Sequence, residues 1–256
     1  MATGTRRAGD FCWINMLTPQ PTEAREFYRT LLGWNFVEMP GMGHRIQVGD
    51  VDIGGIFDVN GPNIPPGARA TIGVMVMVAN ADATCANVTS LGGVAKPAFD
   101  IMRAGRMAVC TDPTGVEFDI WEAKNMQGTM VDSAVHGAPS WSELYTSDDA
   151  RADMFYCELF GWASTSESFP GLSYTTFSLD GIDVAGMMQL SAEMGAMPPR
   201  WVTYFTVDDV DEAARLAVSL GATLCVDLHD LPGIGCFCGI VSPQGVVLYV
   251  IQYKRS

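Results

Sequence analysis

Apolar residues recur at helical spacing near the start of the chain and again 128 residues later. The apolar residues between Ala24 and Leu32 fall at i, i+3, i+4, i+7 and i+8, which places them on one face of an α-helix. Gly33 follows them and can take the left-handed conformation that ends a helix. The segment from Ala152 to Gly161 repeats this pattern and predicts a second helix of the same kind.

Capping residues mark two further helices. Asn80 and Asp208 are of the types that accept hydrogen bonds at a helix N-terminus, and the helices they begin are expected to end at Gly92 and Gly221. Between the helices, short runs bounded by turn residues predict strands at Arg45 to Val48, Ile53 to Asp58, Ile72 to Val78, Met107 to Thr111 and Glu117 to Trp121, with counterparts in the second half. The predicted unit is therefore β-α-β-β-β, occurring four times, in an α+β fold.

The same residues return in the same order in both halves of the chain. The helix ending Phe27-Tyr28 to Gly33-Trp34 recurs at Phe155-Tyr156 to Gly161-Trp162, and Trp13 recurs as Trp141. Such self-similarity indicates an internal duplication. We expect residues 8–125 and 139–253 to form two domains of one fold, each with two βαβββ modules, joined by a linker at 126–138.

Composition narrows the classes of partner. The net charge of −14 repels nucleic acid and anionic lipid, and the apolar run Ile72 to Ala79 is too short to span a membrane. The N-terminus lacks the apolar segment of a secretory signal, and seven cysteines suit reduced thiols better than a disulfide framework. These features predict a cytoplasmic monomer or homodimer whose partner is a small molecule.

The paired modules, the Phe-Tyr-x-x-Leu-x-Gly-Trp helix ending and the turn Asp112 to Gly115 before a last strand resemble the glyoxalase, bleomycin-resistance and extradiol-dioxygenase superfamily, also called vicinal oxygen chelate proteins. The chain looks most similar to tandem two-domain glyoxalase-like proteins of actinobacteria. The resemblance covers residues 10–253. It implies mixed sheets that each curl around a cleft, and metal ligands on the first strand of each module and on the modules' last strands.

The residues at those ligand positions give an unusual set. The positions correspond to Asn15, Gly54 or Gly55, Gly73 and Asp119 in the first half, and to Glu143, Ala185 or Gly186, Val202 and Tyr249 in the second. Zinc or iron sites need about three converging donors, which glycine, alanine and valine cannot supply. The three histidines, His44, His136 and His229, lie at none of these positions. We therefore expect neither a metal nor another cofactor.

The strongest catalytic candidate is Glu143. It lies two residues from Trp141 on a predicted first strand, so both side chains point to one face. In a cleft, burial would raise the pKa of the carboxyl group toward a range useful for acid or base catalysis. An ion pair with Arg200 is an equally open interpretation. Asp119 is the second candidate.

Aromatic and basic residues complete the candidate site. Trp13 with Asn15, and Trp121 with Asp119, share strand faces in the same way and fit the wall of a small-molecule pocket, although packing against helices would explain the tryptophans equally well. Arg103 and Arg106, in a predicted loop between Asp100 and Met107, and Tyr249 are further ligand-binding candidates. Solvated loop charges remain the alternative for the two arginines.

Three functional hypotheses follow. The leading one is a metal-independent glyoxalase/bleomycin-resistance-like protein that binds a small aromatic or carbonyl-rich molecule, either to sequester it or for a proton-transfer, isomerase or lyase step. The second is a metal-dependent lyase or dioxygenase of the same superfamily. The third is an interaction protein without pocket chemistry.

Overall fold

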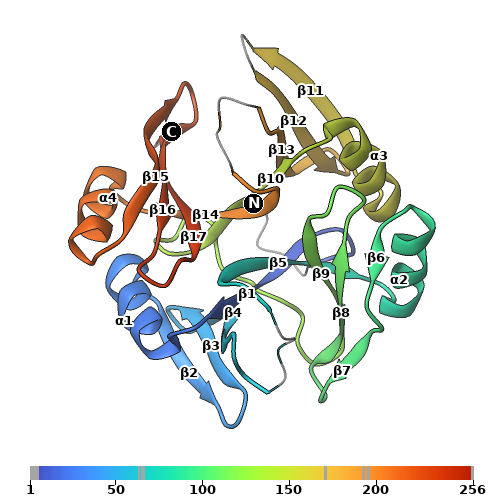
Figure 1. Cartoon of the computed structure of the whole chain (residues 1–256), viewed down its shortest axis with the longest axis horizontal. Coiled ribbons are helices and arrows are strands. Elements are labelled where there is room, and N and C mark those ends of the chain that lie inside the picture. The colour runs from blue at the N-terminus through green and yellow to red at the C-terminus, as the bar shows by residue number, and fades with distance from the viewer. Residues whose placement is uncertain are drawn as a thin grey trace.

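The computed structural model describes residues 6–62, 64, 67–169, 172–191, 194 and 197–254. The chain forms two large mixed sheets with helices packed against them (Figure 1). None of the helices in this described part combines the length and the apolar character that a membrane crossing requires.

The four helices begin and end close to the predicted positions. Their bounds are α1 Pro21–Leu32, α2 Ala81–Ser90, α3 Asp149–Phe160 and α4 Val210–Ser219. The Asn80 side chain caps α2 as predicted, but α4 is capped by Asp209, which accepts from the Glu212 N–H, and not by Asp208. Helices α2 and α4 stop two residues before Gly92 and Gly221, which adopt the left-handed backbone just beyond.

The first sheet takes its strands from the first half of the chain. Its order is β2-β3-β4-β1-β5-β9-β8-β6, with β7 paired to β8. The bounds are β1 Phe11–Thr18, β2 Asn35–Met39, β3 Gly43–Val48, β4 Val51–Asp58, β5 Thr71–Val78, β6 Val94–Ala95, β7 Phe99–Ile101, β8 Gly105–Thr111 and β9 Glu117–Ala123.

The second sheet repeats this arrangement in the order β11-β12-β13-β10-β14-β17-β16-β15. Its strands are β10 Pro139–Thr146, β11 Ala163–Phe169, β12 Leu172–Leu179, β13 Ile182–Gln189, β14 Arg200–Thr206, β15 Thr223–Leu231, β16 Gly235–Val241 and β17 Val247–Tyr253. In both sheets the first strand of each module pairs in parallel with its last strand, and the two first strands pair antiparallel. The α+β fold of tandem paired βαβββ modules is confirmed.

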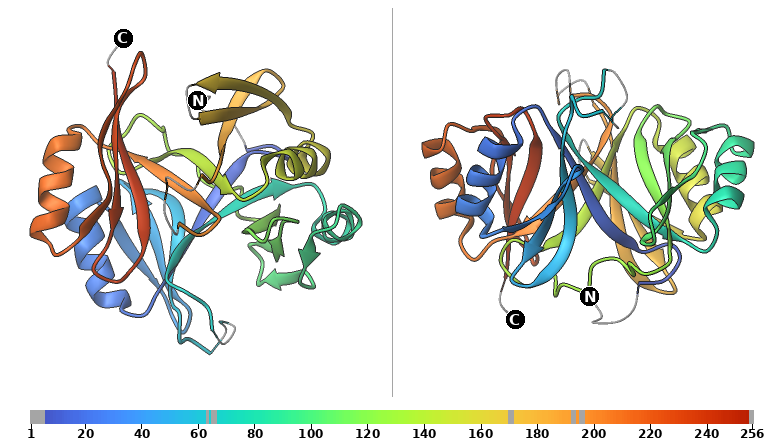
Figure 2. Two further views of the ribbon diagram at one scale, coloured as in Figure 1. Left: turned by 45° about the horizontal axis from the view of Figure 1, so that its top comes forward. Right: turned by 90° about the horizontal axis from the view of Figure 1, so that it is seen from below.

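Each of the two large hydrophobic cores contains residues from both halves of the chain. One core joins residues of α1 and β1 to residues of α4, β14 and β17, and the other joins α2, β5 and β9 to α3 and β13. Helix α1 accordingly lies beside α4, and α2 beside α3, as Figures 1 and 2 show. Each core is thus built from one module of each half.

Residues 126–138 pack against both halves. The Thr129 N–H donates to the Cys12 carbonyl at 2.8 Å, and the Gly137 N–H donates to the Thr206 carbonyl at 2.7 Å. The Trp34 indole N–H also donates to the Gly137 carbonyl at 2.8 Å. The segment expected to be a linker is therefore fixed by backbone hydrogen bonds in both directions.

Candidate functional site

Each sheet has one face covered by helices and one face, here called the inner face, whose buried cluster contains no helix residue. Strand alternation places Trp141, Glu143 and Tyr145 of β10 on the inner face of the second sheet, while Leu144 between them packs in the core beside α3. The carboxylate of Glu143 is consequently surrounded by sheet residues.

Two phenols hold the carboxylate of Glu143. Tyr174 on β12 donates its hydroxyl to Oε2 at 2.9 Å, and Tyr204 on β14 donates to Oε1 at 2.9 Å. The residue is only 4% exposed, and burial raises the pKa of its carboxyl group although the tyrosine hydroxyls oppose this effect. Glu143 is thus a buried carboxylate whose oxygens are oriented by neutral donors.

The ion pair with Arg200 is not formed. No salt bridge reaches Glu143 from any residue within the described ranges, and the buried Nε of Arg200 has no hydrogen-bond partner there. A buried carboxylate without a cation is costly for the folded state in its ionised form. The ionised form of Glu143 is therefore unfavourable on the inner face, where no cation compensates it within the described ranges.

Gly186 leaves the space in which Tyr174 reaches the carboxylate of Glu143. It lies opposite Glu143 across the parallel β10–β13 pair, and a Cβ at this position would overlap the Tyr174 hydroxyl and come within 3.0 Å of the Trp141 indole nitrogen. That nitrogen donates to the Tyr174 hydroxyl at 3.2 Å. Tyr174 therefore occupies the space that a side chain at position 186 would need.

Aromatic rings extend the wall around Glu143. Tyr249 on β17 makes an edge contact with Tyr204 at 4.9 Å between ring centroids and stacks on Phe237 at 5.8 Å. Its hydroxyl is buried without a hydrogen-bond partner among the described residues, and burial raises its pKa. Met188 and Met197 pack against the same cluster. The surroundings of Glu143 are aromatic and apolar, with one phenol group uncommitted.

The first sheet carries a smaller polar pair at the corresponding place. Asn15 on β1 donates its amide to Oδ2 of Asp119 on β9 at 2.7 Å. Burial raises the pKa of Asp119 to about 6, opposed by the Asn15 hydrogen bond. Asn15 lies opposite Gly73, where a Cβ would be 3.9 Å from the Asp119 carboxylate. Both sequence-predicted carboxylates therefore lie on inner faces, one on each sheet.

The tryptophans of the first sheet serve mainly to pack it. Trp121 is 2% exposed, its indole donates to the Met126 carbonyl at 3.0 Å, and its ring fills the space above Gly105. Trp13 is buried in the same cluster with Met75. The packing interpretation describes Trp121 better than a ligand-contacting role.

The two candidate arginines do not meet the carboxylates. Arg106 lies within β8 and not in a loop, on the same face as Ala108 and Cys110, which pack in the core beside α2. Its guanidinium donates to both oxygens of Asp82 at 3.0 and 2.9 Å and also contacts Asp100. Arg103 is exposed in the β7–β8 turn. The expected loop position of Arg106 is therefore wrong, because β8 begins at Gly105.

The donor set does not fit a metal ion of the type that the superfamily resemblance implies. Across the described ranges, no group of three His, Cys, Asp or Glu side chains could hold one. Gly73 and Val202 supply no side-chain donor, and a side chain at Gly186 would displace Tyr174. The histidines lie elsewhere, with His44 beside Arg25, His136 beside Asp208 and His229 against Phe237.

Sequence reasoning missed the two phenols that hold Glu143. Tyr174 and Tyr204 lie 31 and 61 residues away along the chain, and only the sheet register brings them together. A usable signal existed in the glycine at position 186, because a glycine inside a strand often marks a close approach of another group.

Comparison with known proteins places the chain in a family. The model for the Glyoxalase/Bleomycin resistance protein/Dioxygenase superfamily matches residues 11–120. The protein called "Putative glyoxylase CFP32" of Mycobacterium tuberculosis is 30% identical over 96% of this chain and 95% of its own. "Anthracycline biosynthesis protein DauV" of Streptomyces sp. strain C5 is 29% identical over 95% of this chain and 93% of its own.

Solved structures agree on the fold. A Mn(II)-bound glyoxalase from Novosphingobium aromaticivorans aligns with a TM-score of 0.66 at 15% identity, covering 96% of this chain and 82% of its own. The 2,3-dioxygenase LapB from Pseudomonas sp. KL28 aligns with a TM-score of 0.67 at 13% identity, covering 98% and 94%. With its paired βαβββ modules and a relative 30% identical along nearly its whole length, the chain belongs to the glyoxalase/bleomycin resistance protein/dioxygenase superfamily.

Proposed function

We propose that this protein binds a small aromatic or carbonyl-rich molecule at the inner face of the second sheet, and that Glu143 exchanges a proton with it without the help of a metal. One observation carries the proposal. Glu143 is a buried carboxylate with a raised pKa, held by two phenols and surrounded by aromatic rings. Groups with perturbed pKa values in such settings are typical of functional sites.

The geometry suits acid and base chemistry. In its ionised form Glu143 accepts hydrogen bonds from Tyr174 and Tyr204, and burial favours taking up a proton. A carbonyl or phenol group that displaced one tyrosine hydroxyl would find a carboxyl group ready to give or accept a proton. The same contacts hold a ligand whether it is released unchanged or altered, so sequestration and a proton-transfer step share this site.

The relatives support an aromatic ligand. Two of them are named for anthracycline biosynthesis, and anthracyclines are polycyclic aromatic molecules with keto and phenol groups. The inner face offers two partly exposed rings for stacking, Trp141 and Phe237, and Phe237 itself stacks on the buried Tyr249. Hydroxyanthraquinones are therefore the first compounds to test.

The experiment is a thermal-shift screen with 1,2-dihydroxyanthraquinone and related hydroxyanthraquinones, followed by titration calorimetry. The parent is expected to bind at least one of them, and Glu143→Gln, which keeps the shape of the side chain, is expected to weaken binding at least roughly tenfold, about 1.4 kcal/mol. Asp119→Asn on the other sheet is the matched control and is expected to bind like the parent. Equal binding by the parent and Glu143→Gln would refute the role of Glu143.

Metal independence has its own test. Protein dialysed against a chelator is expected to contain no stoichiometric transition metal and to keep its affinity for the hydroxyanthraquinone. About one zinc or iron ion per chain retained after this treatment would favour the metal-dependent alternative.

A further inference from the structure

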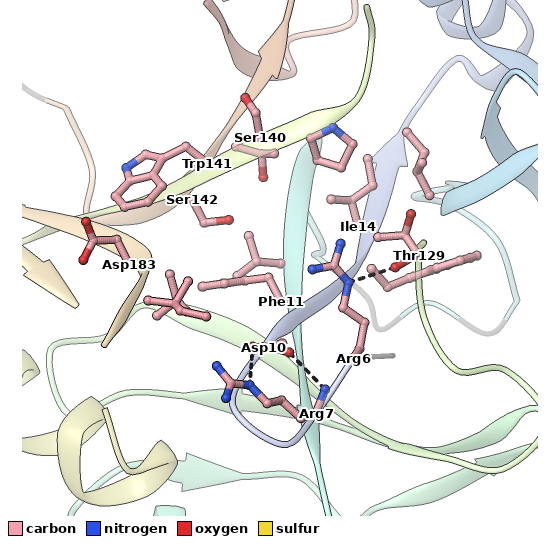
Figure 3. A pocket seen from close by; sticks show the side chains of 17 residues that line it. Arg6, Arg7, Asp10, Phe11, Ile14, Thr129, Ser140, Trp141, Ser142 and Asp183 are labelled. Carbon is pink, nitrogen blue, oxygen red and sulfur yellow. Dashed lines mark hydrogen bonds and ion pairs between the residues drawn. The ribbon is translucent and has the colours of Figure 1, made fainter. Parts of the chain in front are cut away.

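A cavity of about 320 Å³ lies between the two sheets; neither Glu143 nor Asp119 lines it, and Trp141 borders both the cavity and the cluster around Glu143. It is lined by residues of β1, β5, β10 and β14, where the two halves of the chain meet (Figure 3). Ile14 and Val74 in its wall point away from the inner face that carries Asn15 and Asp119. From these residues and this volume we infer that the cavity is a second binding site, for a planar aromatic carboxylate.

The walls favour a flat apolar ring system. Phe11, Trp13 and Trp141 contribute aromatic surface, and Ile14 and Val74 contribute aliphatic surface. Pockets for small molecules usually begin at about 300 Å³ and are lined mainly by apolar and aromatic side chains with a few polar groups. The cavity matches this description and has room for two fused rings.

A buried hydroxyl group in the wall has no hydrogen-bond partner among the residues that the structure describes. Thr203 on β14 is 2% exposed, and its Oγ1 makes no hydrogen bond with any described residue. Buried polar groups in folded proteins are nearly always paired with protein, water or ligand. The neighbouring Ser142 on β10 also lines the cavity. A polar substituent on the ligand, such as a phenol hydroxyl, would pair with Thr203.

Arg6 gives the cavity its preference for an anion. Its Nε donates to the Thr129 carbonyl at 2.8 Å, which fixes the guanidinium at the cavity wall. The rest of that guanidinium makes no hydrogen bond or ion pair with another described residue, whereas Arg7 is engaged by Asp10 and Asp180. Guanidinium groups bind carboxylates through paired hydrogen bonds.

The acidic residues of the wall do not cancel this charge. Asp10 is paired with Arg7, and Asp183 is exposed and lies on the opposite side of the cavity from Arg6 in Figure 3. A ligand carboxylate beside Arg6 and a hydroxyl group beside Thr203 would then hold the ring between the aromatic residues.

The probe for this site is 6-hydroxy-2-naphthoate, which carries both polar groups on two fused rings. Titration calorimetry with the full chain is expected to show one saturable site. Arg6→Gln should weaken binding at least roughly tenfold. Arg215→Gln removes the same charge from the exposed surface of α4, outside the cavity lining, so it should change the affinity less than about threefold.

Thr203→Val tests the buried hydroxyl group with little risk to folding, because it replaces an unpaired hydroxyl by a methyl group of similar size. It should weaken 6-hydroxy-2-naphthoate roughly fivefold but leave the affinity for 2-naphthoate, which lacks the hydroxyl group, as in the parent. The thermal midpoint of each variant reports whether it is folded.

Three results would overturn the proposal. The first is that the parent does not bind either naphthoate. The second is that Arg6→Gln and Thr203→Val, both folded, bind as the parent does. Ordered water would then be the partner of the Thr203 hydroxyl group. The third is that binding is lost in Glu143→Gln and kept in the other two variants, which would place the probe on the inner face.

Discussion

Replacing Asp119 by Asn should stabilise the protein in a way that depends on pH. The pKa of Asp119 is raised from 3.8 to about 6 by burial, so the folded chain binds this proton more tightly than the unfolded chain does. As pH rises above 3.8 the unfolded state loses the proton first, and the free energy of unfolding falls until the folded state also loses it near pH 6. The total loss is about 3 kcal/mol, an upper value because Asp119 keeps some contact with solvent.

The Asp119→Asn variant lacks this titration and keeps an oxygen that can accept the Asn15 hydrogen bond. Urea unfolding followed by tryptophan fluorescence at pH 5, 6, 7 and 8 measures the difference in the free energy of unfolding between variant and parent. We expect this difference to grow in favour of the variant by about 1.4 kcal/mol between pH 5 and pH 8.

The control for this experiment is Asp227→Asn, the same substitution at an exposed residue of β15. Because Asp227 is exposed, this variant measures the effect of losing a negative charge alone. Subtracting variant from parent removes the contribution of Glu143, whose raised pKa acts in the same direction. A difference for Asp119→Asn that changes with pH no more than the difference for Asp227→Asn would show that the folded state does not raise the pKa of Asp119.

Two further predictions concern the first sheet. Arg106→Ala should leave the binding of hydroxyanthraquinones and naphthoates as in the parent, because Arg106 pairs with Asp82 on the helix side of β8; calorimetry showing weaker binding would return Arg106 to the site. Asn15→His combined with Gly73→His should create a site for about one Zn²⁺ or Mn²⁺ with Asp119, because Asn15 and Gly73 are directly paired and a Cβ at Gly73 meets no atom closer than 3.6 Å. The measurement is a metal titration of the double variant, with Asn15→His alone as the control. Metal binding by the double variant that is as weak as binding by the control would contradict this expectation.

The sequence was sufficient to predict the elements because their signals are local. The apolar face of α1 and the glycine that ends it are contiguous in the chain, and the same is true of α3. Strand alternation also predicts correctly that Glu143 and Trp141 share a face. The boundaries are less certain at points such as Asp208 and Asp209, since adjacent residues of one type can both cap a helix.

The remaining features depend on contacts that no local pattern encodes. The partners of Glu143 are set by the register of β10 against β13 and β14, and the pairing of α1 with α4 follows from how the two halves meet. Arg106 shows how sensitive these inferences are to boundaries. Once β8 begins at Gly105, alternation directs the arginine toward α2, away from the inner face.

The two inner faces have the same strand arrangement but carry different side chains at corresponding positions. The strand register aligns Asn15 with Glu143, Gly73 with Val202, and Asp119 with Tyr249. Each sheet therefore has one carboxylate at these positions, but on its last strand in the first half and on its first strand in the second. Asp119 is held by an amide and remains partly exposed, whereas Glu143 is held by two phenols and is buried. Burial raises the pKa of both carboxyl groups, but only the second sheet adds two phenols that orient the carboxylate. We therefore expect proton exchange on the second sheet, and we expect the first to be the one that two added histidines would most readily convert to a metal site.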